Sequence, residues 1–149
     1  MTDTIPETAR LTADVVLFGR REGSLYVAAI RRGHDPYAGC WALPGGHVDV
    51  GEEALVAGYR ELAEETGMNV PTLRLVGVYS TPGRDPRGRY VTFAYTHLLA
   101  HTMPLRAGDD AADAQWVLVD DLLADGARLA FDHDQIIRDA RRIVIGDRP

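Results

Sequence analysis

The sequence predicts a layered α/β or α+β domain built around a mixed β-sheet, and three observations indicate this fold class. Several short apolar segments have the composition of strands, two longer segments repeat apolar residues at helical spacing, and the order is strands, helix, strands, helix. The length of 149 residues is typical of one domain, and no linker or repeat divides it. We therefore expect one domain over residues 1–149, with residues 1–10 as a loose lead-in.

Strands are predicted where Val, Leu, Phe and Tyr gather between turn residues. The turn composition of residues 19–23 favours a hairpin between the first two strands. In the segment 90–100, apolar side chains alternate at period two and share one face. The predicted strands cover residues 12–18, 25–31, 41–43, 73–80, 90–100 and 114–119.

Two helices are predicted from their apolar stripes. The first covers residues 53–66 and ends before Gly67, a typical C-terminal glycine. The second covers residues 132–144, and Asp132 and Gln135 at its start have the spacing of a capping box. The stripe of the first helix that we expect to face the core consists of Leu55, Tyr59 and Leu62.

Charge and composition exclude several classes of protein. With 16 basic and 22 acidic side chains, the net charge of −6 argues against a broad nucleic-acid-binding face. No apolar run approaches the roughly 18 residues of a membrane helix, and the first residues lack the basic and apolar regions of a signal peptide. A single cysteine fits a reducing compartment. We expect a cytoplasmic protein with neither a nucleic-acid nor a membrane partner.

The residue types that are missing exclude whole mechanisms. The chain has no lysine, which removes Schiff-base chemistry and the lysine-dependent phosphate loop. Neither of its two serines, Ser24 and Ser80, lies in a nucleophile elbow. Cys40 lies between apolar neighbours and fits a small buried thiol better than a nucleophile. Catalysis must then depend on carboxylates, histidines, arginines or a bound metal.

Three glutamates of the first helix form an acidic cluster. Glu61, Glu64 and Glu65 are spaced i, i+3, i+4, so their carboxylates lie on one helix face, where like charges repel. A divalent cation relieves this repulsion, and oxygen ligands without Cys or His favour Mg²⁺ or Mn²⁺ over Zn²⁺. A solvated acidic helix face explains the same composition equally well.

The spacing of the fixed residues favours the metal interpretation. Gly46, five residues, Glu52, seven residues and then Arg60-Glu61-Leu62-Ala63-Glu64-Glu65-Thr66-Gly67-Met68 fill every fixed position of G-x5-E-x7-R-E-U-x-E-E-x-G-U, where U is apolar. This pattern resembles the Nudix box. The order of strands and helices on both sides also resembles the Nudix fold, an α/β/α sandwich with a mixed sheet.

The resemblance implies a hydrolase that cleaves a nucleoside diphosphate linked to another moiety and uses Mg²⁺ or Mn²⁺. By analogy with the family, Glu64 and Glu65 ligate the metal, and the carbonyl of Gly45 supplies another oxygen. Glu61 either ligates metal or helps to activate water. Metal ions neutralise a diphosphate and acidify bound water, so these roles are chemically coherent.

The resemblance also gives roles to arginines. Arg60 and Glu52 are implied to form the ion pair that orients the glutamates. In many Nudix enzymes an arginine near the end of the second strand contacts a phosphate, which makes Arg31 and Arg32 candidates, because guanidinium geometry suits a bidentate contact. Either of these two could equally be a surface arginine.

The loop 81–89 carries Arg84-Asp85-Pro86-Arg87-Gly88, which is similar to a stretch in Nudix proteins grouped with ADP-ribose pyrophosphatases. Arg84 and Arg87 could contact the second phosphate or the terminal ribose, and Asp85 could accept hydroxyl hydrogen bonds. An exposed charged turn is the competing interpretation. In the loop 106–114, Asp110 is the candidate for an extra metal ligand or a general base.

The resemblance leaves three functions open. ADP-ribose or a related nucleotide sugar is the favoured substrate, giving AMP and a sugar phosphate. A nucleoside triphosphate is the alternative, and a nucleotide-sensing domain without catalysis is the rival class. We expect the intact glutamates and the lack of length for a helix-turn-helix to favour the enzyme, and the family habit suggests a homodimer. His133 is interpreted as packed at the start of the last helix.

Overall fold

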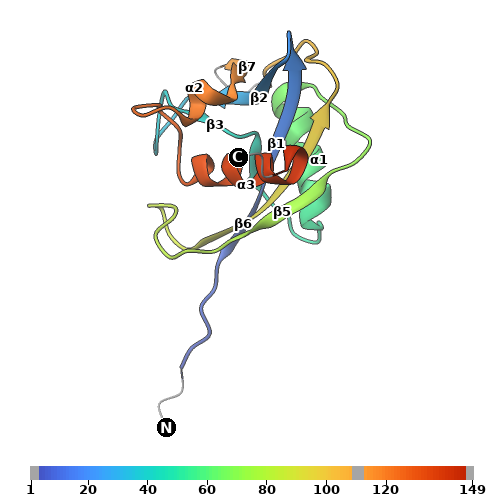
Figure 1. Cartoon of the computed structure of the whole chain (residues 1–149). Coiled ribbons are helices and arrows are strands. Elements are labelled where there is room, and N and C mark those ends of the chain that lie inside the picture. The colour runs from blue at the N-terminus through green and yellow to red at the C-terminus, as the bar shows by residue number, and fades with distance from the viewer. Residues whose placement is uncertain (1–3, 109–112, 147–149) are drawn as a thin grey trace.

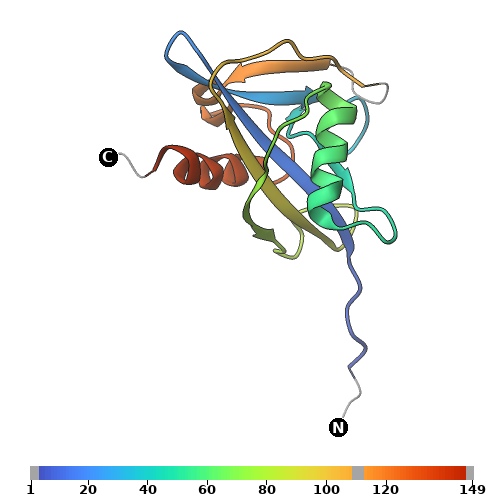
Figure 2. The same cartoon turned by 90° about the vertical axis from the view of Figure 1, so that its right-hand side faces the viewer.

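The computed structural model describes residues 4–108 and 113–146. Within these residues the chain forms one sheet of seven strands with helices on both faces (Figures 1 and 2). In chain order the elements are β1 (Arg10–Arg21), β2 (Ser24–Arg31), β3 (Trp41–Ala42), β4 (Gly45–His47), α1 (Ala54–Thr66), β5 (Arg74–Tyr79), β6 (Tyr90–Leu99), β7 (Asp113–Leu118), α2 (Val119–Leu123) and α3 (His133–Ile145). The six predicted strands and two predicted helices occur in the predicted order, and the short strand β4 is an addition that was not predicted.

The long strand β1 is the centre of the sheet. The strand order is β3-β2-β1-β6-β5, with β4 paired to β1 and β7 paired to β2. β1 and β6 run parallel over ten residue pairs, from Arg10 opposite Tyr90 to Gly19 opposite Leu99. The other strand pairs are antiparallel. The sheet is therefore mixed, as predicted.

Alternate residues of β1 divide the core into two layers. Val15 and Leu17 pack with Leu62 of α1. Val16 and Phe18 point to the opposite face, because successive strand side chains alternate. The α3 residues in their cluster are Ile136, Ile137 and Ala140. Figure 2 shows α1 and α3 on either side of the sheet, which confirms the α/β/α sandwich.

The side of α1 that faces the sheet differs from the prediction. Leu55 keeps 37% of its surface exposed, so its assignment to the core stripe was wrong. The helix instead buries small residues, and an added Cβ on Gly58 would lie 3.2 Å from the Tyr95 ring. The buried residues of α1 are Ala57, Gly58, Leu62 and Thr66.

The start of α3 also differs from the prediction. Asp132 is the N-cap residue, but its side chain makes no capping hydrogen bond, so the expected capping box with Gln135 is absent. Both carboxylate oxygens of Asp132 instead accept hydrogen bonds from Arg84, at 2.9 and 2.6 Å. A tertiary contact therefore replaces the local cap. The short helix α2 was not predicted.

The N-terminal residues lie outside the sheet. Residues 4–9 extend away from it in both views, and β1 begins at Arg10 (Figures 1 and 2). Among the described helices, none is long and apolar enough to cross a bilayer.

Candidate active site

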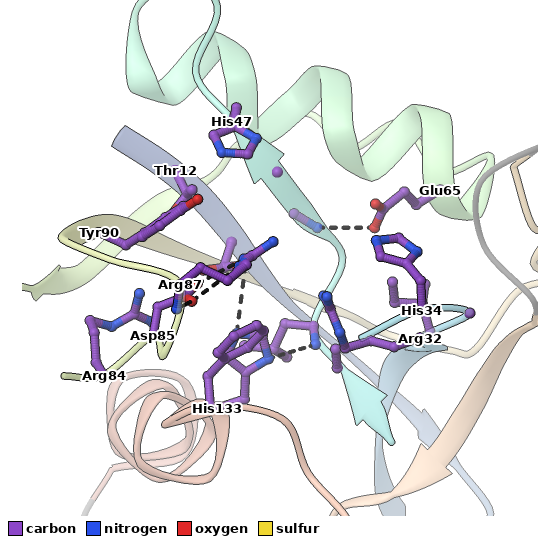
Figure 3. Close-up of a pocket in the computed structure, with 18 of the residues that line it drawn as sticks. Thr12, Arg32, His34, His47, Glu65, Arg84, Asp85, Arg87, Tyr90 and His133 are labelled. Carbon is purple, nitrogen blue, oxygen red and sulfur yellow. Dashed lines mark hydrogen bonds and ion pairs between the residues drawn. The ribbon is translucent and has the colours of Figure 1, made fainter. Parts of the chain in front are cut away.

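A pocket of about 210 Å³ opens where β1, β2 and β4 meet the end of α1, the loop before β6 and the start of α3. In Figure 3, Glu65 approaches it from α1, and His133 approaches from α3. Arg84, Asp85 and Arg87 approach from the loop between β5 and β6. The pocket thus joins segments that are far apart in the sequence.

Two of the three helix glutamates point inward toward β4. Glu65 Oε2 accepts a hydrogen bond from the Gly45 N–H at 3.0 Å. Glu61 lies against Gly46, where an added Cβ would stand 2.5 Å from Glu61 Oε1, so a larger residue would displace this carboxylate. Glu64 points outward, with 57% of its side chain exposed.

Burial disfavours the ionised form of the two inward carboxyl groups, Glu61 and Glu65. Burial raises the pKa of Glu65 to about 8, and the negative charges of Glu61 and Asp14 add to the shift, against the hydrogen bond from Gly45. Burial also raises the pKa of Glu61, although Arg60 opposes this. A cation close to these carboxyls would favour their charged form.

Arg60 connects the acidic residues around α1. Its Nε and Nη2 donate to the two oxygens of Glu52 at 2.8 and 2.9 Å, and its Nη1 lies 2.9 Å from Glu61 Oε1. Its Nη1 also lies 3.3 Å from Glu64 Oε2, and its Nη2 donates to the His47 carbonyl. The Arg60 guanidinium lowers the pKa of Glu52 to about 2. Arg60 therefore restrains the side chains on which the acidic cluster depends.

Asp14 is a pocket residue that the sequence analysis missed. It lies on β1 and is 7% exposed, and its Oδ2 accepts a hydrogen bond from the Thr92 hydroxyl at 2.6 Å. Its Oδ1 lies so close to Gly45 that an added Cβ there would overlap it. The sequence contained a signal for this site, because Asp14 interrupts an otherwise apolar strand.

The loop arginines are held by carboxylates. Arg84 is 5% exposed and binds Asp132, as described for the start of α3. Arg87 donates to both oxygens of Asp85, at 3.1 and 2.7 Å. Burial alone would raise the pKa of Asp85, but the hydrogen bonds from the Arg87 side chain and backbone hold it below its usual range. Asp85 therefore enters the pocket with its charge compensated.

Arg31 and Arg32 point to different places. Arg31 also lines the pocket, but it is exposed, and its guanidinium lies over the Trp41 ring, 4.3 Å from the ring centroid. Arg32 turns into the pocket, where its guanidinium lies 5.0 Å from the centroid of Phe131 (Figure 3). The Arg32 Nε donates to the Pro36 carbonyl at 2.7 Å, whereas its Nη2 is buried without a hydrogen-bond partner. Burial, and then the charge of Arg87, lower the pKa of Arg32.

The comparisons with known proteins agree with this geometry. The NUDIX domain family model matches residues 8–140, which is most of the chain and includes the whole pocket-forming α1 segment. The chain belongs to the NUDIX family. The glutamates of α1 with Arg60, Glu52 and Gly46 are thus the NUDIX motif in its folded position.

Three NUDIX relatives are similar to this chain. An ADP-ribose pyrophosphatase of Methanocaldococcus jannaschii is 42% identical over 78% of this chain and 66% of its own length. The ADPR responsive transcriptional repressor NtrR of Acinetobacter baylyi is 32% identical over 87% of this chain and 52% of its own length. The NUDIX domain of Shewanella oneidensis NrtR, solved with ADP ribose, is 32% identical with a TM-score of 0.85, over 95% of this chain and 94% of that one. The chain thus spans less than two thirds of the length of the two full-length relatives.

The donor chemistry of the NUDIX motif fits a hard divalent cation. Its candidate ligands are carboxylate and carbonyl oxygens, and burial leaves Glu65 with a raised pKa that a cation would lower. Within residues 4–108 and 113–146, however, no three His, Cys, Asp or Glu side chains are already arranged around a metal position. Arg60 holds Glu61 and Glu64, and Gly45 holds Glu65, so metal binding would require these side chains to rearrange.

The remaining residues that the sequence analysis considered lie outside the described residues, on β7 or at the start of α3. Asp110 lies outside the described residues. Asp113, another acidic residue of the predicted loop 106–114, belongs to β7, where its carboxylate accepts hydrogen bonds from the Ala114 N–H and the Gln115 side chain. His133 is packed at the start of α3, as interpreted from the sequence. Pocket residues that the sequence did not indicate include Thr12, Asp14, His34 and Tyr90.

Proposed function

We propose that this NUDIX domain is a metal-dependent pyrophosphohydrolase that cleaves ADP-ribose, or a related nucleoside diphosphate sugar, into AMP and a sugar phosphate. The observation that carries the proposal is one pocket lined both by the Glu65 carboxylate of α1 and by Arg32, whose buried Nη2 has no hydrogen-bond partner. A diphosphate needs both, a cation held by carboxylates and a separate guanidinium. The name of the M. jannaschii relative supports the same substrate.

The proposed metal ligands are Glu61, Glu64, Glu65 and the carbonyl of Gly45, and the proposed metal is Mg²⁺ or Mn²⁺. Neutralisation of the diphosphate and acidification of water are the chemistry that such a cation supplies when bound. Arg60 and Glu52 orient the glutamates through the ion pairs described above. Water attacks one phosphorus atom, the bridging P–O bond breaks, and a proton is released to solvent.

The other end of the pocket supports a sugar over a third phosphate. Arg87 is paired with Asp85, and Arg84 is paired with Asp132, so this loop brings little uncompensated positive charge. A ribose needs hydroxyl partners, and the Asp85–Arg87 pair offers an acceptor and a donor side by side. A triphosphate would instead require a free cation at this position. Arg32 is the proposed phosphate contact, and Arg31 is not, because it lies over Trp41.

The decisive experiment is a substrate panel. ADP-ribose, other nucleotide sugars, dinucleoside polyphosphates and nucleoside triphosphates are assayed for kcat/KM with Mg²⁺ and with Mn²⁺, and products are identified by chromatography. We expect AMP and ribose 5-phosphate from ADP-ribose and no activity in chelator. A triphosphate turned over roughly a hundredfold better than ADP-ribose would refute the substrate while keeping the enzyme class.

A second candidate function is nucleotide sensing. The repressor relative from A. baylyi and the ADP-ribose-bound domain from S. oneidensis support it, as does the engagement of Glu61 and Glu64 by Arg60. Isothermal titration against ADP-ribose separates the two functions. Tight binding without product after hours of incubation with Mg²⁺ or Mn²⁺ would establish the sensor.

We also propose that the protein is a cytoplasmic homodimer. Two large apolar side chains of the edge strand β5, Leu75 and Val78, are 49% and 50% exposed and support a self-association surface. Light scattering is expected to give twice the chain mass of 16.3 kDa, and a particle of that single mass at micromolar concentration would refute the dimer.

A further inference from the structure

Three consecutive residues at the start of α3 contact three different walls of the pocket. Phe131, which has a left-handed φ of 52°, lies beneath the guanidinium of Arg32. Asp132 binds Arg84 of the loop before β6. His133, the next residue, accepts a hydrogen bond from the backbone between β3 and β4. One turn of chain therefore fixes parts of the site that are far apart in sequence.

The hydrogen bond of His133 defines the state of its ring. The Leu43 N–H donates to His133 Nδ1 at 3.0 Å, so Nδ1 carries no proton and the neutral ring is protonated at Nε2. The ring is buried, and burial lowers the pKa of His133. Its Nε2 faces Asp14 Oδ1 at 3.8 Å. In this arrangement, His133 has no free basic nitrogen with which to take a proton from water.

The partner of His133 leads directly to the NUDIX motif. Leu43 is followed by Pro44, whose carbonyl accepts a hydrogen bond from the Val15 N–H at 2.9 Å, and then by Gly45. The Gly45 N–H donates to Glu65 at 3.0 Å. Proline fixes its own φ, which reduces the backbone freedom that could absorb a shift between Leu43 and Gly45.

We propose that His133 is a positioning residue for the carboxylate centre. By accepting the Leu43 N–H, its Nδ1 fixes the backbone from Leu43 to Gly45 and thereby places the Gly45 carbonyl and the Glu65 carboxylate for the reaction. The proposal rests on the proposed hydrolase function and assigns no contact between His133 and substrate.

The test uses two variants of matched shape. Asparagine and leucine branch at the same carbon and leave similar space at position 133, but only the asparagine Oδ1 can replace Nδ1 as acceptor for Leu43. We expect His133→Leu to lose roughly tenfold to hundredfold in kcat, because misplacement of reacting groups by about 1 Å can cost about a hundredfold. Its KM should change little, because Arg32 is untouched. His133→Asn should retain most of the wild-type kcat.

A second readout does not require activity. Hydrogen exchange of the Leu43 amide, followed by ¹⁵N NMR, should be slow in the wild type and in His133→Asn and fast in His133→Leu. Imidazole ¹⁵N shifts of the wild type should show the Nε2–H tautomer. If the wild type is inactive on the whole substrate panel, the proposed function is refuted. A protected Leu43 amide in that protein would still show that the hydrogen bond to His133 exists.

Three outcomes would overturn the positioning role. The first is wild-type kcat in His133→Leu together with rapid exchange at Leu43. The second is low kcat in His133→Asn together with a protected Leu43. If His133→Leu does not fold, His133→Gln replaces it, since its longer amide reaches toward Asp14 and leaves Leu43 without an acceptor. The third outcome that would overturn the role is therefore wild-type kcat in His133→Gln.

Discussion

At the scale of single residues, the main feature of this NUDIX domain is a buried carboxyl group whose charged form is disfavoured. Glu65 is buried beside Glu61 and Asp14, and its pKa rises to about 8 from an ordinary value near 4.5. The folded chain therefore binds this proton more tightly than the unfolded chain does. The contribution of Glu65 to stability is greatest below about pH 4.5 and is lost as the pH rises through 8.

A substitution that removes this ionisation should separate stability from activity. In buffer with chelator, Glu65→Gln is expected to melt at a higher temperature than wild type at pH 9, and the difference should shrink at pH 4. The glutamine cannot ionise and so does not add to the repulsion from Glu61 and Asp14. Thermal melts at several pH values measure this, with Glu53→Gln, a change at the exposed N-cap residue of the same helix, as control. A difference independent of pH would contradict the raised pKa.

The same variant should be almost inactive. Glu65→Gln is expected to lose several orders of magnitude in kcat with Mg²⁺, because an amide is a poor ligand for a hard cation and the carboxylate is a proposed ligand. Turnover of ADP-ribose near the wild-type rate would show that the assignment of Glu65 is wrong.

Adjacent arginines provide a matched comparison for substrate binding. Arg32→Ala is expected to raise the KM for ADP-ribose about tenfold or more, since it removes the guanidinium with a free nitrogen in the pocket. Arg31→Ala should change KM little, because Arg31 is exposed and lies over Trp41. Steady-state kinetics of the two variants decides this, and equal effects would contradict the assignment.

At the scale of elements, the loop before β6 depends on α3 for its position. Arg84 and Asp132 form a partly buried, bidentate ion pair between these two elements, and Tyr79 at the end of β5 donates to Asp139 of α3 at 2.7 Å. This connection explains why the capping box predicted for Asp132 and Gln135 does not form. The spacing to Gln135 satisfies the local capping rule, but Arg84 is 48 positions away and provides a charged partner that local spacing cannot reveal.

Loss of this ion pair should destabilise the fold. Arg84→Met is expected to lower the free energy of unfolding by about 1–3 kcal/mol, because it leaves the Asp132 carboxylate poorly solvated. Addition of Asp132→Asn should recover part of the loss, since the double variant has no unpaired charge. Urea denaturation of the two single variants and the double variant measures the coupling. Additive losses would show that the pair is not coupled.

At the scale of the whole molecule, the sequence predicted what local patterns encode. The motif from Gly46 to Met68, α1 and the succession of strands follow from spacing and periodicity. The pocket does not, because Asp14, Arg32 and His133 are brought together by sheet pairing and helix packing. Asp14, a charged residue within an apolar segment, was a local signal of that convergence that the sequence analysis did not use.

The two layers of the core share β1, so the domain should unfold as one unit. Trp41 of β3 and Trp116 of β7 lie on different strands beside β2. Tryptophan fluorescence and far-ultraviolet circular dichroism are expected to give coincident urea transitions. Transitions that separate by more than the fitting error would contradict a single domain over residues 1–149.

The parallel pairing of β1 with β6 has a consequence during synthesis on the ribosome. β1 can form its hairpin with β2 as soon as both have left the ribosome, but its other edge gains its partner only when Leu99 has been made. During that interval an apolar strand has unpaired backbone groups, which favours association with other chains. We infer that nascent chains ending before Tyr90 are the species most dependent on chaperones.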